Sequence, residues 1–299
     1  MLEYIEYIKN NKLGVIELNK SFKNMTTLKI GGKIKLLFYP YTNECFINFY
    51  RYYINNKKYP LFVIGNGSNI FASSKDYNGI VVCFKKMWFK YGIYNNQLLV
   101  NSGVMLMDLI NYLKNINLGG FEKLAYIPAT IGGMVMMNAG AYKVDISDLL
   151  ISIKCIDNKG EVIIYNKKEI NFSYRKSNLN NVIILECVFE VKNINKININ
   201  NTIEWIKDNR TLKQPIESNN AGSTFKNYEN KSSWKLIDEI GFRGYNINDA
   251  YVSSKHCNFL INKKDCTSDD MLSLINLINN KIYDKYGHKL DCEWIFINF

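Results

Sequence analysis

The chain has 299 residues, of which 47% are hydrophobic and 22% charged, and its formal net charge is +11. This balance is typical of a globular protein long enough for two or three domains. The uncharged run of residues 124–142 is too short and too rich in Gly and Asn for a membrane span, and the acidic start Met1–Glu6 is unlike a signal peptide. Neither membrane insertion nor export is therefore expected.

The cysteines and histidines do not form a recognisable metal or disulfide pattern. The seven cysteines occur singly, their number is odd, and there are only two histidines. This usage fits a reducing cytoplasm. A basic charge suits nucleic acid or small anionic substrates, but the lysines are spread evenly along the chain, with no Arg-rich tract and no zinc finger, so nucleic-acid binding is not expected. No metal, nucleic-acid or membrane partner is expected.

In the first part of the chain, strand patterns alternate with two helical ones. Strands are predicted at Ile34–Tyr39, Leu61–Ile64 and Ile80–Phe84, and a hairpin at Lys90–Tyr94 and Leu98–Asn101 that turns at Asn95-Asn96. Helices are predicted at Asn43–Lys57 and Val104–Asn115, the latter from apolar residues at helical spacing.

The rest of the chain predicts more strands and then a small last module. Two strands flank Asp157-Asn158-Lys159-Gly160, a loop covers Asn171–Asn178, and a strand covers Val182–Val191. A basic helix at 200–213 leads to helix Ser232–Ile240, strands near Tyr251 and Phe259, helix Ser268–Tyr286 and a final strand Leu290–Ile297. Thr267 or Ser268 is expected to cap the long helix. The pattern favours an α+β fold over a doubly wound sheet.

The run of residues 124–142 combines Gly132, Gly133 and Gly140 with Asn138 and other small residues. Because glycine has no Cβ and tolerates positive φ, such a backbone can approach a large ligand, and successive N–H groups can hold a pyrophosphate. The segment suggests a wall against which a dinucleotide lies. A tightly packed helix contact is the alternative.

The loop Gly65-Asn66-Gly67-Ser68-Asn69 directly follows a predicted strand. A Rossmann fingerprint would need a third glycine where the next residue is Ile, and a Walker loop would need a lysine. The loop is therefore either a phosphate loop, with N–H groups of the glycines and the side chains of Ser68 and Asn69 as donors, or only a tight turn.

Three further side chains are candidates for chemistry. Arg175 lies in a short loop, where its planar guanidinium can bind a carboxylate through two hydrogen bonds; taken alone, a plain surface arginine is the commoner explanation. Ser223 is not in a G-x-S-x-G motif, and a hydrolase triad would have to recruit His256 or His288. Glu293 shares an apolar face of the final strand, where its pKa should be raised or a cation should pair with it, unless that edge faces solvent.

Together and in order, these segments resemble the UDP-N-acetylenolpyruvoylglucosamine reductase family from Asn24 to Ile297. The matching blocks are Thr26-Thr27…Ile30-Gly31-Gly32, Gly65–Asn69, Ile127-Pro128…Thr130–Gly133, Met137–Tyr142, Tyr174–Ser177, Arg210…Lys213-Gln214-Pro215, Ala221–Asn227, Val252–Asn262 and Leu290…Glu293. The chain lacks the inserted loop of the longer subtype after Ser177, and so it resembles the shorter one.

The resemblance implies an α+β chain with an FAD-binding fold of the vanillyl-alcohol oxidase type, built from two α+β subdomains, and a small C-terminal α+β substrate domain. The expected boundaries are 1–75, 76–199 and 200–299. It also implies non-covalent FAD, NADPH as the reductant and UDP-N-acetylglucosamine enolpyruvate as the second substrate. Hydride would pass from flavin N5 to C3, and C2 would be protonated, in a cytoplasmic monomer that makes the peptidoglycan precursor UDP-N-acetylmuramate.

The resemblance also implies residue roles. Arg175 would bind the substrate carboxylate, Ser223 would protonate C2, and a protonated Glu293 would donate a hydrogen bond beside the carboxylate. The residues expected to bind FAD are Gly65, Asn66, Gly67, Ser68, Asn69, Pro128, Ala129, Thr130, Gly132, Gly133, Asn138, Ala139 and Gly140. Those expected to contact the substrate are Tyr174, Lys213, Lys226 and Asn227.

Four residues depart from the family pattern. Tyr126, Ala129 and Lys143 stand where glycine is usual, and Tyr228 stands where proline is usual. They add bulk or flexibility near ligand loops, and the sequence leaves open whether this lowers the FAD affinity. Two other functions stay open: a different FAD oxidoreductase of the same fold, and a basic binding protein that has lost catalysis.

Overall fold

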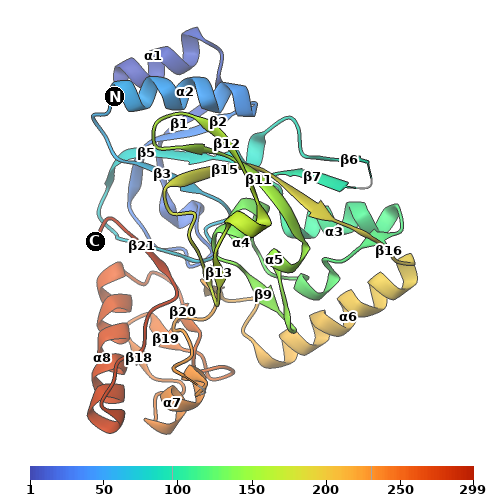
Figure 1. Ribbon diagram of the computed structural model, residues 1–299. Helices are drawn as coiled ribbons and strands as arrows, with labels where there is room; N and C mark the ends of the chain where they lie inside the picture. Colours follow the sequence, from blue (N-terminus) through green and yellow to red (C-terminus); the bar gives the residue numbers. More distant parts are fainter. Residues whose placement is uncertain (96, 230) are drawn as a thin grey trace. The chain divides into compact units, whose positions relative to one another are not determined.

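The computed structural model describes residues 1–95, 97–229 and 231–299 (Figure 1). Its contacts divide the chain into two compact units. The first unit comprises Met1–Leu18, Leu36–Asn66 and Asn78–Lys207, and the second comprises Asn19–Lys35, Gly67–Tyr77 and Asp208–Phe299. Each unit therefore combines segments that are distant in sequence. The three-part division at residues 75 and 199 stays a prediction.

A four-stranded sheet in the order β1-β2-β5-β3 begins the fold. Its strands are β1 (Gly14–Ser21), β2 (Lys33–Pro40), β5 (Tyr77–Cys83) and β3 (Leu61–Ile64). Helices α1 (Leu2–Asn10) and α2 (Asn43–Asn55) lie side by side near it (Figure 1). An aromatic-rich core that includes Tyr4, Phe38, Phe46 and Phe49 joins these elements. The predicted strands and α2 are confirmed, whereas α1 and β1 were not predicted.

A five-stranded antiparallel sheet in the order β12-β11-β15-β7-β6 forms the rest of the first unit. Its strands are β12 (Val162–Asn166), β11 (Leu150–Asp157), β15 (Val182–Glu190), β7 (Gln97–Asn101) and β6 (Tyr91–Tyr94). Apolar residues of α3 (Leu106–Asn115), α4 (Ile131–Met136) and α6 (Lys196–Lys213) share a buried core with them. The predicted strands are confirmed; Asn96 of the predicted hairpin turn lies outside the described residues.

Several two-residue strands and single helical turns lie between the longer elements along the chain. The two-residue ladders are β8 (Leu118–Gly119) with β16 (Lys192–Asn193), β9 (Gly140–Ala141) with β10 (Val144–Asp145), and β13 (Phe172–Ser173) with β14 (Lys176–Ser177). Single turns of helix are α5 (Ile146–Leu149) and the 3-10 segments Phe22–Asn24, Phe84–Lys86, Glu122–Leu124 and Lys167–Glu169. The loop predicted at Asn171–Asn178 is therefore wrong, because this segment folds into the β13–β14 hairpin.

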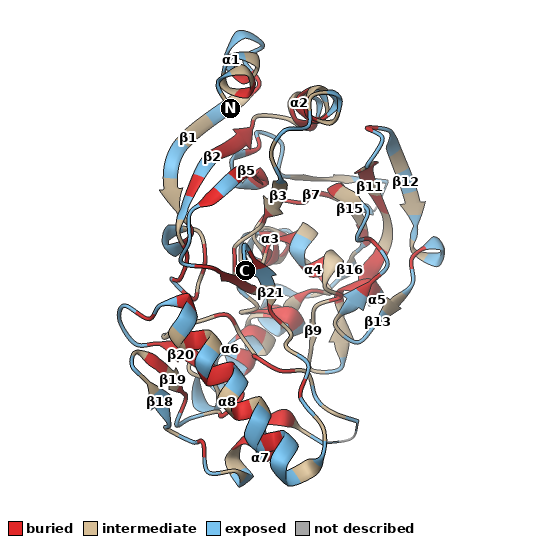
Figure 2. Ribbon diagram, turned by 90° about the vertical axis from the view of Figure 1, so that its left-hand side faces the viewer, coloured by how far each residue is buried: buried red, intermediate tan, exposed pale blue. Residues whose placement is uncertain are grey.

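The second unit packs two helices on a small sheet in the order β17-β20-β19-β18. Its elements are β17 (Asn219–Asn220), α7 (Ser233–Glu239), β18 (Asn246–Ile247), β19 (Ala250–Val252), β20 (Leu260–Asn262) and α8 (Ser268–Tyr286). Figure 2 shows the buried and exposed sides of α8; Leu274 and Ile278 are buried. Thr267 caps α8 as predicted, since its side chain accepts a hydrogen bond from the N–H of Asp270.

The second unit also holds a parallel pair, β4 (Ile70–Ala72) with β21 (Ile295–Ile297). The final strand predicted at Leu290–Ile297 is wrong in its first half, since β21 begins only at Ile295.

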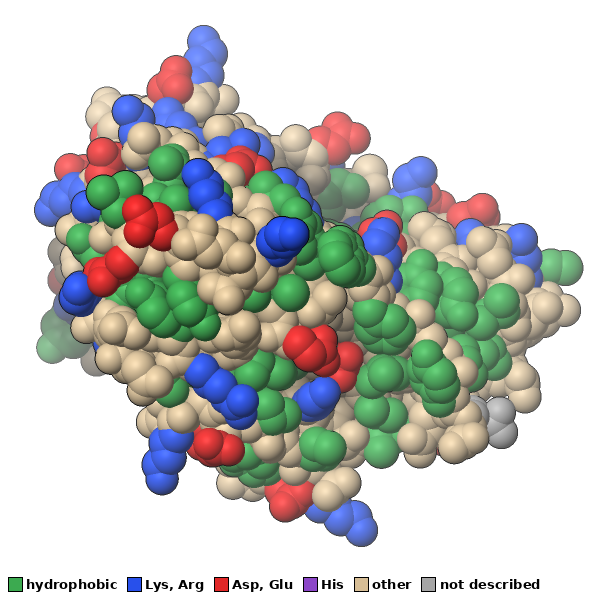
Figure 3. All heavy atoms as spheres, turned by 90° about the horizontal axis from the view of Figure 1, so that it is seen from above, with side chains coloured by type: hydrophobic (Ala, Val, Ile, Leu, Met, Phe, Trp, Pro, Cys, Tyr) green, Lys and Arg blue, Asp and Glu red, His purple; other side chains and the backbone are tan. Residues whose placement is uncertain are grey.

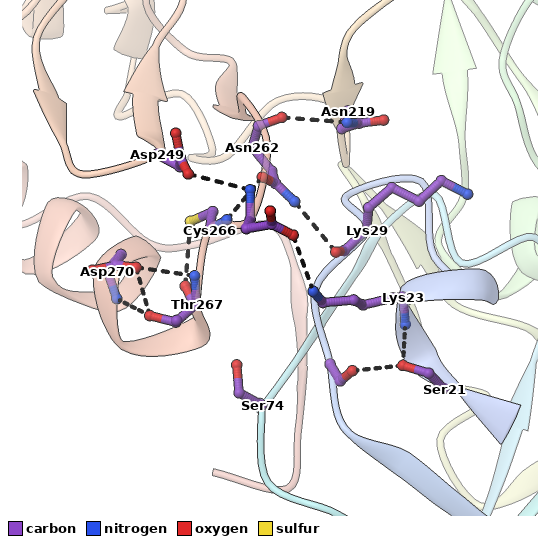
Figure 4. A network of polar contacts seen from close by, with 12 residues as sticks. Ser21, Lys23, Lys29, Ser74, Asn219, Asp249, Asn262, Cys266, Thr267 and Asp270 are labelled. Atoms are coloured by element: carbon purple, nitrogen blue, oxygen red, sulfur yellow. Dashed lines mark hydrogen bonds and ion pairs between the residues drawn. The ribbon is translucent and has the colours of Figure 1, made fainter. Parts of the chain in front are cut away.

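Buried Asn262 links three segments of the second unit (Figure 4). Its Nδ2 donates to the carbonyl oxygens of Leu28 and Lys29 at 3.1 and 3.2 Å, and its Oδ1 accepts from the N–H of Cys266 at 3.1 Å. Buried backbone groups need such partners, so one amide side chain fixes the path of residues 28–29 beside the start of α8.

Figure 3 shows how charged side chains are distributed on one face of the molecule. On the face drawn in Figure 3, basic side chains lie among acidic ones and do not gather in one patch. Within the described residues, none of the helices combines the length and the apolar character needed to cross a membrane. All seven cysteines are free thiols.

Candidate active site

Two of the predicted cofactor segments adjoin in the first unit. The Nδ2 of Asn66 donates to the carbonyl oxygen of Pro128 at 2.7 Å, and Lys85 Nζ donates to Asn66 Oδ1 at 2.8 Å. A Cβ added to Gly65 would lie 2.3 Å from Thr130 Oγ1, so this close approach requires glycine. The loop after β3 is thereby joined to the segment that begins α4.

Within α4, the two adjacent glycines have different surroundings. The N–H of Gly132 donates to the carbonyl oxygen of Ser102 at 2.8 Å, and a Cβ at Gly132 would lie 2.6 Å from Ser102 Cβ. Gly133 is exposed, and a Cβ there would meet only Thr130 Oγ1 at 3.4 Å. Gly132 thus makes the packed helix contact that was the alternative interpretation of the run. Gly133 presents bare backbone, as the ligand-wall interpretation requires.

Two buried polar atoms beside these segments lack partners. Neither Ser102 Oγ nor Asn138 Oδ1 has a hydrogen-bond partner within the described residues, whereas Asn138 Nδ2 donates to the carbonyl oxygen of Ser173 at 3.1 Å. An unsatisfied buried polar atom costs about 1–3 kcal/mol. A ligand with donors and acceptors, such as a flavin with its phosphates and hydroxyls, would remove this cost. Sequence reasoning missed Ser102, although the polar residues Asn101-Ser102-Gly103 at the end of a strand are a recognisable signal.

Arg175 lies at the tip of the β13–β14 hairpin, with φ of 55°. Its Nη2 donates to the carbonyl oxygen of Gly140 at 2.7 Å, and its Nη1 lies 3.5 Å from the carbonyl oxygen of Asn138 and 3.6 Å from Asp145 Oδ1. A Cβ at Gly140 would lie 1.7 Å from Asp145 Oδ1, so glycine makes room for this carboxylate. The guanidinium is therefore held at the end of the glycine-rich run, while Tyr174 is exposed.

In the second unit, the Ser223 and Glu293 segments run beside each other. The N–H of Glu293 donates to the carbonyl oxygen of Thr224 at 2.8 Å, and the N–H of Lys226 donates to that of Asp291 at 2.9 Å. Burial raises the pKa of the intervening Cys292 to about 11, so its thiol is neutral at pH 7 and is no nucleophile. Two of the three predicted catalytic residues thus lie on paired segments.

Glu293 does not lie in a strand, which corrects the face argument made from sequence. Its carbonyl oxygen accepts from Asn69 Nδ2 at 3.1 Å, and the N–H of Ile295 donates to the carbonyl oxygen of Asn69 at 2.9 Å. These bonds turn the chain between the Thr224 pairing and β21. They also bring the end of the Gly65–Asn69 loop next to Glu293.

Asn258 and Gly67 fix the same region of the second unit. Asn258 Nδ2 donates to the carbonyl oxygen of Phe225 at 2.8 Å, and Asn258 Oδ1 accepts from the N–H of Phe225 at 2.9 Å. Gly67 has φ of +66°, and a Cβ there would lie 2.1 Å from the carbonyl oxygen of Met25. The N–H of Thr27 donates to the carbonyl oxygen of Gly67 at 3.2 Å. The Thr26-Thr27 block therefore supports the loop.

The other predicted residues take less specific places. Lys213, Asn227 and Pro128 are exposed, whereas Ser68, Ala129, Ala139 and Lys226 are half-buried.

The three proposed catalytic residues lie in different units: Arg175 belongs to the first unit, and Ser223 and Glu293 belong to the second. That all three meet one substrate stays a prediction. Among residues 1–95, 97–229 and 231–299, no cluster of three His, Cys, Asp or Glu residues could hold a metal ion.

Two of the departures from the family pattern adopt backbone that favours glycine. Tyr126 has φ of 63° and Lys143 has φ of 62°. A glycine would adopt this conformation without strain, whereas a tyrosine and a lysine do so at an energetic cost.

Comparisons with known proteins agree with this geometry. Residues 34–166 match the FAD binding domain, and residues 214–297 match the C-terminal domain of UDP-N-acetylenolpyruvoylglucosamine reductase. The reductase of that name from Rickettsia conorii is 36% identical over 94% of this chain and 95% of its own length. The crystal structure of the Thermus caldophilus reductase matches with a TM-score of 0.79 at 28% identity, over 95% of this chain and 99% of that one.

A fold-level likeness extends further. Berberine bridge enzyme from Eschscholzia californica matches with a TM-score of 0.51 at 12% identity, over 64% of this chain and 44% of that one. The expected α+β fold, with an FAD-binding fold of the vanillyl-alcohol oxidase type, is confirmed. The chain belongs to the UDP-N-acetylenolpyruvoylglucosamine reductase family.

Proposed function

We propose that this chain reduces UDP-N-acetylglucosamine enolpyruvate to UDP-N-acetylmuramate with NADPH, as a cytoplasmic monomer in peptidoglycan precursor synthesis. The observation that carries the proposal is a 36% identity over 94% of the chain to a relative named for this reductase. The pairing of the Ser223 and Glu293 segments, both inside residues 214–297, supports it. The free cysteines support the cytoplasm.

The first unit offers the groups that FAD needs. Bound FAD would accept hydride from NADPH and supply it to the vinyl carbon C3 of the substrate. Asn66 and Thr130 would position its phosphates, the bare backbone at Gly133 would allow close approach, and Ser102 Oγ and Asn138 Oδ1 would gain the partners that they lack. Neither histidine precedes residue 256, so no histidine attachment lies in the matched FAD binding domain.

Arg175 would stabilise the charge that hydride addition creates. Addition at C3 of an enol ether carboxylate moves negative charge toward C2 and the carboxylate. A guanidinium aimed there before the reaction lowers the barrier, and removal of one such donor typically costs about 3–4 kcal/mol. The carbonyl oxygen of Gly140 and the carboxylate of Asp145 fix the direction of the guanidinium. Tyr174, Lys213, Lys226 and Asn227 would contact the rest of the sugar nucleotide.

Ser223 would donate the proton to C2, and a protonated Glu293 would donate a hydrogen bond beside the carboxylate. A serine hydroxyl is a weak acid, but the enolate carbon is a strong base, so direct contact matters more than acidity. Gly222 supports this contact because it has φ of +76° and a Cβ there would meet nothing within 4 Å. The backbone before Ser223 is therefore open on that side.

Anaerobic stopped-flow absorbance tests the proposal. NADPH should bleach the flavin band of the purified protein, and the enolpyruvyl sugar nucleotide should then restore it. Bleaching without restoration would indicate a different FAD oxidoreductase of this fold. A colourless protein that rejects added FAD would indicate a binding protein without catalysis.

A further inference from the structure

A pocket of about 550 Å³ lies within the first unit, and none of the residues that line it was given a role in binding or catalysis above. Its lining comes from the 3-10 segment Glu122–Leu124, the turn between β9 and β10, and helix α6. The lining residues are Lys123, Tyr142, Lys143, Asn201, Thr202 and Trp205. Pockets that bind small molecules usually have volumes of about 300–1,000 Å³.

The lining combines a stacking surface with positive charge. Trp205 is 54% exposed, and its ring meets that of Tyr142 edge-on at 5.2 Å between centroids. Lys123 and Lys143 are exposed, and no ion pair links either of them to a described acidic side chain. Indole rings stack on nucleobases, and lysines bind phosphate as point charges. Asn201 and Thr202 add an amide and a hydroxyl that can bond to a base or a ribose.

The turn that carries Tyr142 and Lys143 is strained. Ala141 pairs with Val144, so these two residues form a two-residue hairpin turn, and their φ angles are 50° and 62°. Such turns favour Asn-Gly because both central residues need positive φ. A bulky aromatic and a lysine are costly here, and strain of this kind persists mainly where it serves a function. Both side chains line the pocket.

We propose that this pocket binds a nucleotide, with its base stacked on Trp205 and its phosphate against Lys123 and Lys143. The inference rests on the proposed function in one respect: both substrates of that reaction carry nucleotides. The adenosine 2′-phosphate of NADPH and the UDP group of the sugar nucleotide offer the same chemistry. The test therefore uses one probe for each.

Calorimetric titration of the FAD-loaded protein with 2′,5′-ADP, and separately with UDP, measures the pocket directly. Trp205→Ala should raise the Kd of one probe about tenfold or more, as expected for a lost base–aromatic stack. Trp205→Phe keeps a ring and should recover most of the affinity. Trp88→Ala, at an indole that is 70% exposed outside the pocket, should change the Kd less than twofold.

Lys143→Gly separates binding from folding. Glycine relieves the left-handed strain, so the Tm should stay the same or rise, while the Kd of the same probe increases about tenfold. The salt dependence of the remaining binding should also weaken. Lys168→Ala, at an exposed lysine outside the pocket, is the matched control and should leave Kd unchanged.

The probe that responds to both substitutions identifies which substrate supplies the nucleotide. The proposal is overturned if neither probe binds the wild-type protein, or if both pocket variants bind within twofold of it. Failure of the proposed function has a different signature, because it would leave these Kd shifts intact while the enolpyruvyl substrate fails to reoxidise the flavin.

Discussion

The backbone N–H of Glu293 donates a 2.8 Å hydrogen bond to the carbonyl oxygen of Thr224. Because Ser223 precedes Thr224 directly, this bond sets the separation of the proposed proton donor and the proposed carboxyl group through backbone atoms. The side chains of Ser223 and Glu293 take no part in the bond. Either can therefore be replaced while the pairing of the two segments is kept.

Ser223→Ala should separate the two half-reactions. Flavin reduction by NADPH should stay within about twofold of wild type, since no proton is needed at C2 in that step. Reoxidation by the enolpyruvyl substrate should slow by at least about a hundredfold, because positioned general acids contribute roughly 10²–10⁴ in rate. Stopped-flow absorbance of the flavin measures both rates. Equal slowing of the two would remove Ser223 from the role of proton donor.

Arg175→Lys keeps the charge but loses the planar pair of donors. We expect turnover to fall by about a hundredfold, because an ammonium group cannot bind a carboxylate through two parallel hydrogen bonds. The FAD content should stay near that of wild type. Lys176→Ala, at the exposed neighbour, is the control and should retain turnover. Wild-type kcat in the Arg175→Lys variant would exclude a role for Arg175 at the carboxylate.

Several helices and strands of this fold could be predicted from short sequence patterns. The helix Ser268–Tyr286 was predicted to the residue, because a capping threonine followed by two aspartates marks its start. The strands of the five-stranded sheet were also predicted, since each is an apolar run between turn residues. The hairpin around Arg175 was not, because two two-residue strands carry no periodicity.

The candidate site was harder to predict than the fold, because contacts between residues far apart in sequence form it. The glycine-rich segments were readable, but the bond from Asn66 to Pro128 joins residues 62 positions apart and has no local signature. The shortened final strand has the same cause, since Asn69 bonds to Glu293 from 224 positions away. Alternation predicts which side chains share a face only for residues that lie in a strand, and Glu293 lies outside β21.

The adjacent glycines of α4 should respond differently to alanine. Gly132→Ala places a Cβ 2.6 Å from Ser102 Cβ, so the unfolding free energy should fall by about 1–3 kcal/mol, as in other overpacked cores. Gly133→Ala has room, and alanine in a helix should stabilise the FAD-free protein by about 0.5–1 kcal/mol. FAD occupancy of Gly133→Ala should nevertheless fall, because the methyl group lies on the proposed ligand wall. Thermal melts of FAD-free protein and flavin absorbance measure the two effects; an unchanged melt for Gly132→Ala would contradict the packing.

His256 should make the protein less stable as the pH falls below neutrality. Burial, the main cause, and the nearby Arg243 lower the pKa of His256 below the ordinary value of about 6.5. As the pH drops through that value, the unfolded chain takes up a proton that the folded chain still refuses. The stabilisation is therefore complete above pH of about 6.5 and is lost progressively below it, until the folded pKa is passed, at no more than about 1.4 kcal/mol per pH unit.

Denaturant unfolding of the wild type and of His256→Gln between pH 5.5 and 7.5 measures this slope. The variant should lose less stability than the wild type over that range, because glutamine does not titrate. Ile278→Val is the control: Ile278 is buried in α8 and does not titrate, so this variant should lose a similar amount of stability at both ends of the range. Parallel pH profiles for the wild type and His256→Gln would show that burial does not suppress protonation of this imidazole.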